Sequence, residues 1–338
     1  MAENTQIAEK KAFTTSLSEW SNEITGLIAR DYDSCGVQFD EYSKQCAMEA
    51  MSSIYNLVKT NPKLNMANLD TSNLRGIVER CASLKLNANA FPRECYFQLR
   101  NVKVGTDENG KDVWQQMIEM GIEGAGNDAI LTNYGKDVDK VYPYWVVKEG
   151  DTYIPPKHKG IEITPPEWEE KGLSQRAVRV VYPVKLTDGT VTYLIADRES
   201  VKVNLLAHVR NNLMNETFGL CENRYKATDK QRKEIAEKKE QIYNALRECE
   251  TVDDMLKCDI AKPFMSGAWL DTPESMIVRK MCNNAIKKFP KNYNSMANKA
   301  FLEMDEVYQQ SQAEIEENEN SVEFADCDVI ESGEVVEK

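Results

Sequence analysis

The chain has 338 residues, of which 41% are hydrophobic and 29% are charged, a composition typical of a globular protein with a sizeable core. It contains no run of 18 apolar residues, and its first 16 residues lack the apolar centre of a secretory signal. We therefore expect a cytoplasmic protein with neither a membrane span nor a signal peptide.

The net charge of −13 argues against a nucleic-acid partner until the charge is located along the chain. Residues 303–338 hold 13 acidic and 1 basic side chains, a net charge of −12. The other 302 residues hold 42 acidic and 41 basic side chains, a net charge of −1. Since binding depends on local charge, a nearly neutral body can still present a basic surface to DNA.

The cysteines and histidines indicate no metal or disulfide site. Nine cysteines are present, an odd number, and no pair forms a CxxC motif, so we expect reduced thiols in a cytosol. The only histidines, His158 and His208, lack a partner at metal-ligand spacing and are expected to be structural.

Helices are predicted first along the chain. Residues 1–14 are polar and expected to be flexible. Apolar residues recur at helical spacing from Ser16, again over 41–59, and again from Asp70 or Thr71. Residues 15–60 would form helices that mediate self-association.

Strands follow. Residues 95–104 and 111–122 read as two strands around the TDENG turn, and residues 129–135 as a short helix. Residues 139–154 resemble a hairpin, and residues 176–199 form a clearer one around Asp188-Gly189. The order of helices, strands and further helices predicts an α+β fold with antiparallel hairpins.

The C-terminal third returns to helix. About half of residues 222–262 are charged, and the segment predicts a solvated helix or a loop. Residues 301–338 are acidic, poor in apolar residues and expected to be largely disordered. This tail either keeps the protein soluble or acts as a charge decoy that competes with DNA or engages a partner.

The helix in WLDTPESMIVRKMCNNAIKKFPK, residues 269–291, carries the most information. Pro273 suits its first turn, Glu274 favours its dipole, and Pro290 ends it. Spacing of 100° per residue gives it one apolar face, comprising Val278, Met281, Cys282, Ala285, Ile286 and Phe289. The opposite face holds Met276, Lys280, Asn283, Asn284 and Lys287, with Arg279 and Lys288 beside it, and no acid after Glu274. Such side chains suit a nucleic-acid backbone, although a plain solvated face would look the same.

This helix resembles the carboxy-terminal helix of the RecT family of phage single-strand annealing proteins, within the RecT and lambda Red-beta superfamily. The matching positions are Trp269, Met276, Arg279-Lys280, Lys287-Lys288 and Pro290. The segments LKLNANAFPRECYFQL, QQMIEMGIEGAGNDAILTNYG and VVYPVKLTDGTVTYLIADRESVKV resemble further family segments in the same order. The resemblance covers residues 60–291. The segment 137–177 is longer and more acidic than is usual in the family.

The resemblance implies an α+β core over residues 61–300, in which helices flank a curved antiparallel sheet and a long helix lies beside a DNA groove. It implies binding of single-stranded DNA and of the annealed duplex intermediate, and strand annealing without ATP, cofactor or catalytic residue. It also implies a homo-oligomer, as a ring or helical filament, that works with a 5′→3′ exonuclease and the host single-strand binding protein. Lys280 and Lys287 match as backbone contacts, with Arg279 and Lys288 beside them, while Trp269 matches but could simply pack.

Further groove residues are hypotheses from the sequence. They are Arg75, Arg93, Arg100, Arg198, Lys202 and Arg210. Tyr96 and Phe97 could stack on bases or pack in the core.

Two other functions stay open. A metal-dependent nuclease could use Asp197, Glu199 and Lys202, or Asp137 and Asp139, although neither spacing matches a known nuclease motif. A structural phage protein would assemble without DNA affinity. The chain has no GxxxxGK[ST] motif, and its Gly121, Gly124 and Gly126 do not make GxGxxG.

Overall fold

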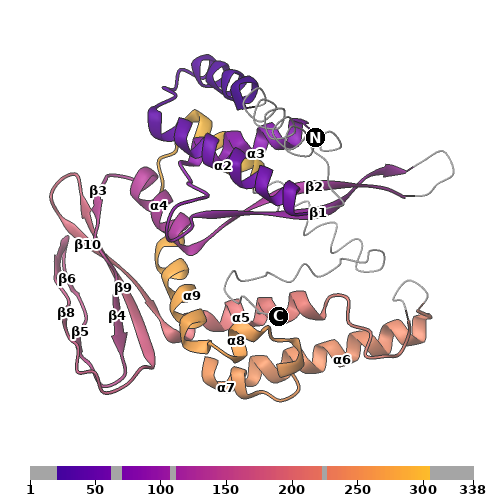
Figure 1. Ribbon diagram of the computed structural model, residues 1–338. Helices are drawn as coiled ribbons and strands as arrows, with labels where there is room; N and C mark the ends of the chain where they lie inside the picture. The colour runs from indigo at the N-terminus through magenta and orange to yellow at the C-terminus, as the bar shows by residue number, and fades with distance from the viewer. Residues whose placement is uncertain (1–20, 62–70, 107–111, 223–226, 305–338) are drawn as a thin grey trace, which may run out of the picture.

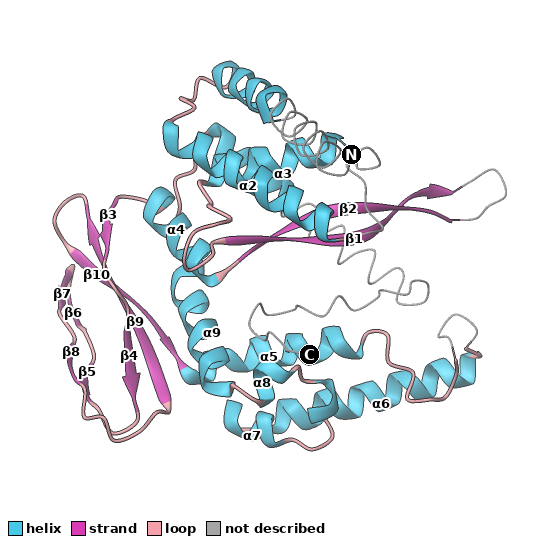
Figure 2. Ribbon diagram, in the orientation of Figure 1, coloured by secondary structure: helices cyan, strands magenta, loops and turns pink. Residues whose placement is uncertain are grey.

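The computed structural model describes residues 21–61, 71–106, 112–222 and 227–304, and it confirms the predicted α+β class. Two bodies rich in helices lie above and below a long β-hairpin, and an antiparallel sheet stands to one side (Figures 1 and 2). The predicted flexible N-terminus, residues 1–14, and the tail from residue 305 lie outside the described residues. Residues 295–304 form a helix, so the first positions of the predicted tail are ordered.

The helices of the upper body and one face of the hairpin share one hydrophobic core. Its elements are a helix over residues 21–34, α2 (Glu41–Thr60), α3 (Thr71–Leu84), β1 (Cys95–Thr106) and β2 (Asp112–Ile122). Asp40 caps α2 by accepting a hydrogen bond from the Ser43 backbone N–H at 2.8 Å. Ile28, Ile54, Ile77 and Ile118 meet in this core, and Ala297 from the helix over 295–304 joins them. The predicted boundary at residue 60 therefore does not separate two cores.

The lower body is helical. It comprises η2 (Arg198–Val201), α5 (Lys202–Leu213), α6 (Asp229–Glu248), α7 (Val252–Lys257), η4 (Lys262–Phe264) and α8 (Gly267–Leu270). The helix predicted within the charged segment is α6, which begins with a capping box between Thr228 and Gln231. It buries Ile242 and Leu246 against α5 and α7 and leaves its charged residues in solvent.

The sheet at the side is built on one long strand. β9 (Ala177–Leu186) pairs with β10 (Val191–Asp197) through the predicted turn, in which Gly189 has a φ of 86°. β3 (Val138–Val141) and β4 (Trp145–Lys148) both pair with the other edge of β9. The prediction of a hairpin over residues 139–154 is therefore wrong. β9 is long enough to pair with both short strands in succession, so they do not pair with each other.

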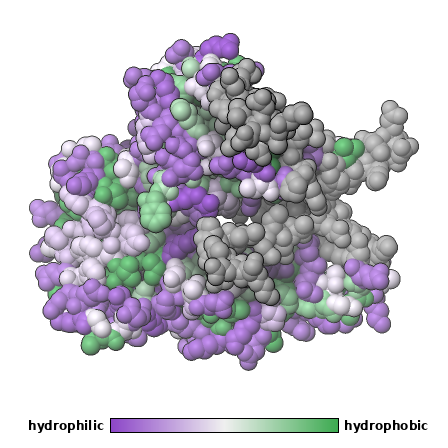
Figure 3. All heavy atoms as spheres, viewed as in Figure 1, coloured by the Kyte–Doolittle hydropathy of each residue, from purple (hydrophilic) through white to green (hydrophobic). Residues whose placement is uncertain are grey.

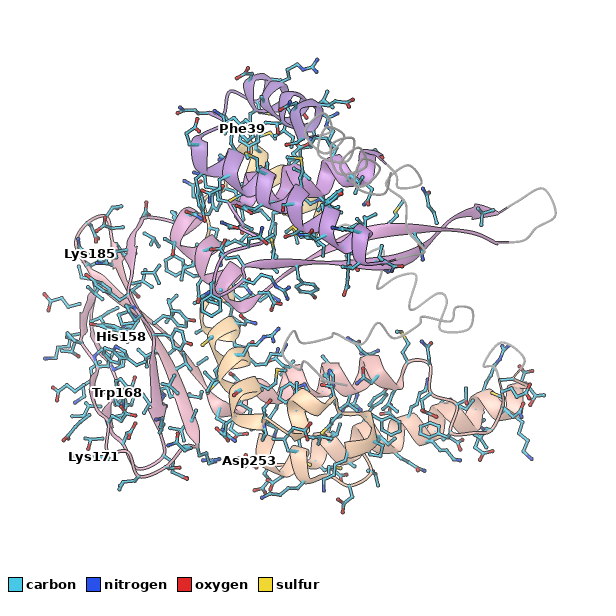
Figure 4. The ribbon with its side chains drawn as sticks, viewed as in Figure 1. Phe39, His158, Trp168, Lys171, Lys185 and Asp253 are labelled. Carbon is cyan, nitrogen blue, oxygen red and sulfur yellow. The ribbon has the colours of Figure 1, made fainter. Side chains whose placement is uncertain are left out.

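A ribbon of short strands lies on the outer side of this sheet. β5 (Thr152–Ile154) pairs with β8 (Glu167–Glu169), and β6 (Lys157–Lys159) pairs with β7 (Glu162–Thr164). Trp168 of β8 stacks on Trp145 of β4 with ring centroids 5.8 Å apart. Figure 4 labels His158 and Trp168 on this ribbon, with the sheet between them and the rest of the molecule.

α4 (Gly124–Tyr134) and α9 (Pro273–Lys287) join the bodies at the centre of Figure 1. α9 packs on β9, β10, η2 and α4, which explains why so much of its surface is apolar. It buries Ile277, Met281, Cys282, Ala285 and Ile286. Trp269, just before it, is 2% exposed and packs in the same core, 6.1 Å from the ring of His208.

Candidate nucleic-acid interface

The face of α9 opposite its buried side bears the residues that we call the basic stripe: Lys280, Asn283, Asn284 and Lys287. They occur at spacings of three and four, so they form one row along the helix. The row lies between α4 and α5, because Asn283 contacts the first and Asn284 contacts the second. Figure 3 shows hydrophilic surface set back between the two helical bodies.

The two asparagines hold neighbouring helices and do not simply face solvent. Asn127 of α4 donates from Nδ2 to Oδ1 of Asn283 at 3.3 Å. Asn284 donates from Nδ2 to Oδ1 of Asn204 at 2.8 Å and to the carbonyl oxygen of Ser200 at 3.2 Å. The bonds of Asn284 use its Nδ2 donors, whereas Asn283 uses only its Oδ1 acceptor in the described chain. Both asparagines thus help to position the lysines between α4 and α5, and the prediction that their donors bind the DNA backbone stays a prediction for Asn283.

Lys280 is a half-buried cation in a positive environment. Burial lowers the pKa of its ammonium group, and the nearby charges of Arg279 and Lys287 lower it further. Among the residues that the structure describes, no carboxylate pairs with Lys280. Burial and like-charge repulsion both destabilise such a cation, and a bound anion would relieve both.

Lys287 and Lys288 continue the positive charge to the end of α9. Both are exposed, and no ion pair involves either within the described chain. Lys291, by contrast, binds backbone oxygens. Its Nζ donates to the carbonyl oxygens of Ile286 and Phe289, at 3.0 and 2.8 Å, and so closes the helix end. Lys291 thus uses its donors at the helix end, whereas Lys280, Lys287 and Lys288 make no side-chain hydrogen bond or ion pair within the described chain.

The β1–β2 hairpin turns one polar face away from the upper core. Phe97 and Leu99 pack against that core, so the alternating side chains Tyr96, Gln98 and Arg100 lie on the other face. Glu119 accepts hydrogen bonds there from Gln98 at 3.1 Å and from Arg100 at 3.4 Å. Of the two aromatics considered for base stacking, Phe97 thus packs in the core.

Tyr96 lies on this polar face, over a glycine. Its ring covers Gly121 on β2, where a Cβ would come within 2.2 Å of the ring. The guanidinium of Arg93 lies 5.8 Å from the ring centroid. Tyr96 is half-buried, so stacking on a base stays a hypothesis for this residue alone.

Two arginines converge at the start of α4. Arg93 and Arg279 each donate to Glu123, the N-cap residue, at 3.2 Å. One carboxylate between two guanidinium groups leaves one positive charge uncompensated. This trio joins the base of the hairpin to α9, immediately beside Lys280.

The other predicted contacts lie elsewhere or are already occupied. Arg75 pairs with Asp31 and ties α3 to the helix over residues 21–34. Lys202 donates to the carbonyl oxygens of Cys249 and Glu250, at 2.7 and 2.8 Å, after the end of α6. Both side chains therefore already have structural partners.

Arg198 is 3% exposed, so its prediction as a DNA contact is corrected. Its guanidinium binds Asp253, Glu274 and the carbonyl oxygen of Ala177, all within 3.1 Å. Figure 4 labels Asp253 in the lower body, below α9. Arg210 is exposed on α5 but lies roughly 200° round the helix from His208, the α5 side chain whose pKa the charge of Lys280 lowers.

Sequence reasoning missed Glu123, Asn204 and His208 as neighbours of the stripe. His208 is structural as predicted: its Nε2 accepts from the Ser266 backbone N–H at 3.1 Å, and burial followed by the charge of Lys280 lowers its pKa. No spacing in the sequence signals these residues, because each comes from a segment distant from α9.

A metal-dependent nuclease would need a set of metal ligands, and among the described residues no three His, Cys, Asp or Glu side chains are grouped so that they could hold a metal ion. Asp197 pairs with Arg179, Glu199 accepts from the Val252 backbone N–H, and Asp139 pairs with Lys185. These carboxylates therefore have separate protein partners.

The chain matches no protein-family model, and no curated protein matches it. Within the described residues, no helix combines the length and apolar character needed to cross a bilayer.

Proposed function

We propose that the protein binds single-stranded DNA and anneals complementary strands without ATP, as a homo-oligomer in phage recombination. The observation that carries the proposal is Lys280, a half-buried cation beside Arg279 and Lys287 with no carboxylate partner in the described chain. The resemblance of the α9 segment to RecT proteins supports the same reading.

The basic surface on α9 has the properties that strand annealing requires. Two strands repel each other through their phosphates, and lysines that bind phosphate reduce the repulsion and release counterions. Contacts to the backbone alone leave the base edges free to test pairing and make binding independent of sequence. The polar face of the hairpin, with Arg100 and Tyr96, extends the surface beyond α9.

Assembly and partners belong to the same proposal. Copies aligned in a ring or filament would join short binding surfaces into one long track, and linkage of sites raises overall affinity. A 5′→3′ exonuclease would supply the single strand, and the host single-strand binding protein would be displaced from it.

The test mixes the purified protein with a labelled oligonucleotide, adds the complement without ATP, and follows pairing and complex stability against salt. The variant Lys280→Ala/Lys287→Ala should lose acceleration of pairing. Since log K for single strands falls with log salt by about 0.7 per phosphate contact, the slope should decrease by about 1.4.

The matched control is Lys157→Ala/Lys159→Ala, which removes the same charge from two exposed lysines of β6. It should behave as the wild type. Folded wild-type protein that neither binds DNA nor speeds pairing would sink the proposal and favour a structural assembly protein. Magnesium-dependent cutting of the oligonucleotide would favour the nuclease.

A further inference from the structure

A cavity of about 900 Å³ lies on the side of α9 away from the basic stripe. Val278 and Cys282 of α9 line it, and Cys282 lies roughly 200° round the helix from Lys280. The other walls come from the loop before β1, the start of α4, and strands β4 and β9. Its volume lies within the usual range for small-molecule sites.

One end of the cavity is positive. Arg93 and Arg279 line it and share the carboxylate of Glu123. Each guanidinium has five N–H donors, and only one of each reaches Glu123. Donors and one net positive charge therefore remain for an anionic group, and planar guanidinium groups suit a phosphate.

A carboxyl group lies farther along the same wall. Asp128 lines the cavity, five residues and thus roughly 7.5 Å along α4 from Glu123. Its Oδ1 accepts a hydrogen bond from the Tyr182 hydroxyl at 3.0 Å. Within the described residues this is the only side-chain hydrogen bond of the carboxyl group, so it keeps acceptor capacity toward the cavity.

Aromatic rings form part of the walls. Tyr144 is half-exposed and lies over Tyr182 with ring centroids 5.0 Å apart. Phe91 is fully exposed at the rim, between Ala90 and Pro92. A phenylalanine in open solvent beside a cavity provides a stacking surface for a planar ligand.

We propose that this cavity binds one nucleotide, with its phosphate on Arg93 and Arg279, its base against Tyr144 and Phe91, and Asp128 accepting hydrogen bonds from the base. The arrangement favours guanine, whose N1–H and N2–H donors lie side by side and suit a carboxylate. The cavity contains no residue of the basic stripe, although Arg279 lies beside Lys280, and binding there does not depend on annealing. The nucleotide is either free in solution or a unit of a bound DNA strand.

The test measures binding of dGMP, dAMP, dCMP and dTMP to the full-length protein by calorimetry. dGMP should bind most tightly. Asp128→Asn keeps an oxygen that accepts the hydrogen bond of Tyr182 but removes the negative charge. Its affinity for dGMP should be at least tenfold lower and its preference among the four bases should be lost, because charged hydrogen bonds contribute about 1.5–3 kcal/mol. Phe91→Ala changes an exposed side chain and should cost about tenfold through lost stacking.

The variant Lys280→Ala/Lys287→Ala separates this inference from the proposed function. This variant should bind dGMP with the affinity of the wild type, even though its affinity for single-stranded DNA is reduced. An oligonucleotide with one fluorescent guanine analogue identifies the source of the ligand. If the fluorescence of the analogue changes on binding to the wild type but not on binding to Phe91→Ala, the cavity holds a base of the DNA strand. If the fluorescence change is the same with both proteins, the ligand of the cavity is the free nucleotide.

Two outcomes would overturn the inference. One is the absence of binding by any of the four nucleotides at millimolar concentration to folded protein. The other is wild-type affinity for dGMP in both Asp128→Asn and Phe91→Ala.

Discussion

Arg198 donates hydrogen bonds to both carboxylate oxygens of Glu274, at 2.9 and 2.6 Å, and so fixes the first turn of α9 to the end of β10. The same guanidinium binds both oxygens of Asp253 in α7. The Arg198 side chain is 4% exposed, while Asp253 and Glu274 reach solvent in part. The position of α9, and hence of its lysines, depends on this buried junction.

Replacing Arg198 should destabilise the fold without directly removing a DNA contact. Arg198→Met keeps much of the volume but leaves Glu274 without a cation in the described chain, while Asp253 keeps its ion pair with Arg176. The free energy of unfolding should therefore fall by about 3 kcal/mol. Arg198→Lys keeps the charge but not the paired geometry and should cost less. Urea unfolding measures both. A salt slope of DNA binding that changes in folded Arg198→Lys would instead mark Arg198 as a phosphate contact.

Asp128 should make the stability depend on pH in a recognisable way. Burial raises the pKa of its carboxyl to about 6, while the Tyr182 hydroxyl opposes the shift. When the pKa of a carboxyl group is higher in the folded than in the unfolded protein, ionisation of that group destabilises the fold. Below about pH 4 the group is protonated in both states and has no effect on the free energy of unfolding. Between about pH 4 and pH 6 the destabilisation grows, and above about pH 6 it is constant. Asp128→Asn should therefore be more stable than the wild type at pH 7.5 and equal to it near pH 3.5.

Urea midpoints of the two proteins at both pH values give this comparison, since the other titrating groups cancel in the difference. An equal difference at both pH values would show that the substitution acts through packing and not through the charge of Asp128.

Two helical glycines should respond oppositely to alanine. At Gly126 in α4, a Cβ would lie 2.1 Å from the backbone oxygen of Glu94, so Gly126→Ala should lower the free energy of unfolding by roughly 1–3 kcal/mol. At Gly76 in α3, nothing lies within 4 Å of the added Cβ. Gly76→Ala should then stabilise by about 0.5–1 kcal/mol, as helix propensity dictates.

Thermal and urea unfolding of this glycine pair test the contact between α4 and the residues before β1. Stabilisation by both substitutions would mean that the segment at Glu94 moves aside without cost.

Lys280 should lower the stability of the folded protein while it raises the affinity for DNA. Burial and its cationic neighbours lower the pKa of its ammonium group, so the charged form is disfavoured in the folded protein. Lys280→Met removes that charge and keeps the length of the side chain, so the melting temperature should rise at low salt while DNA affinity falls. Lys157→Met on exposed β6 should change neither. A lower melting temperature for Lys280→Met would show that the ammonium group has a stabilising partner.

Local patterns predicted most of the secondary structure. The apolar period of 3.6 residues located α2, α3 and α9, and the Asp188-Gly189 turn located the β9–β10 hairpin. They failed at β3 and β4, because the partner of both strands is β9, some 40 residues further along the chain. They also failed to show that Ile277 is buried and that Asn283 and Asn284 have partners.

The sequence by itself determined the α+β class, the extent of α9, its row of lysines and the concentration of negative charge after residue 302, because these follow from residue order and helical or strand period alone. Only the tertiary structure decided which cations are free. Arg198 meets Glu274 from 76 positions away, while Lys280 meets no carboxylate in the described chain. Pairing between distant segments depends on how helices and strands pack, and no local period encodes it.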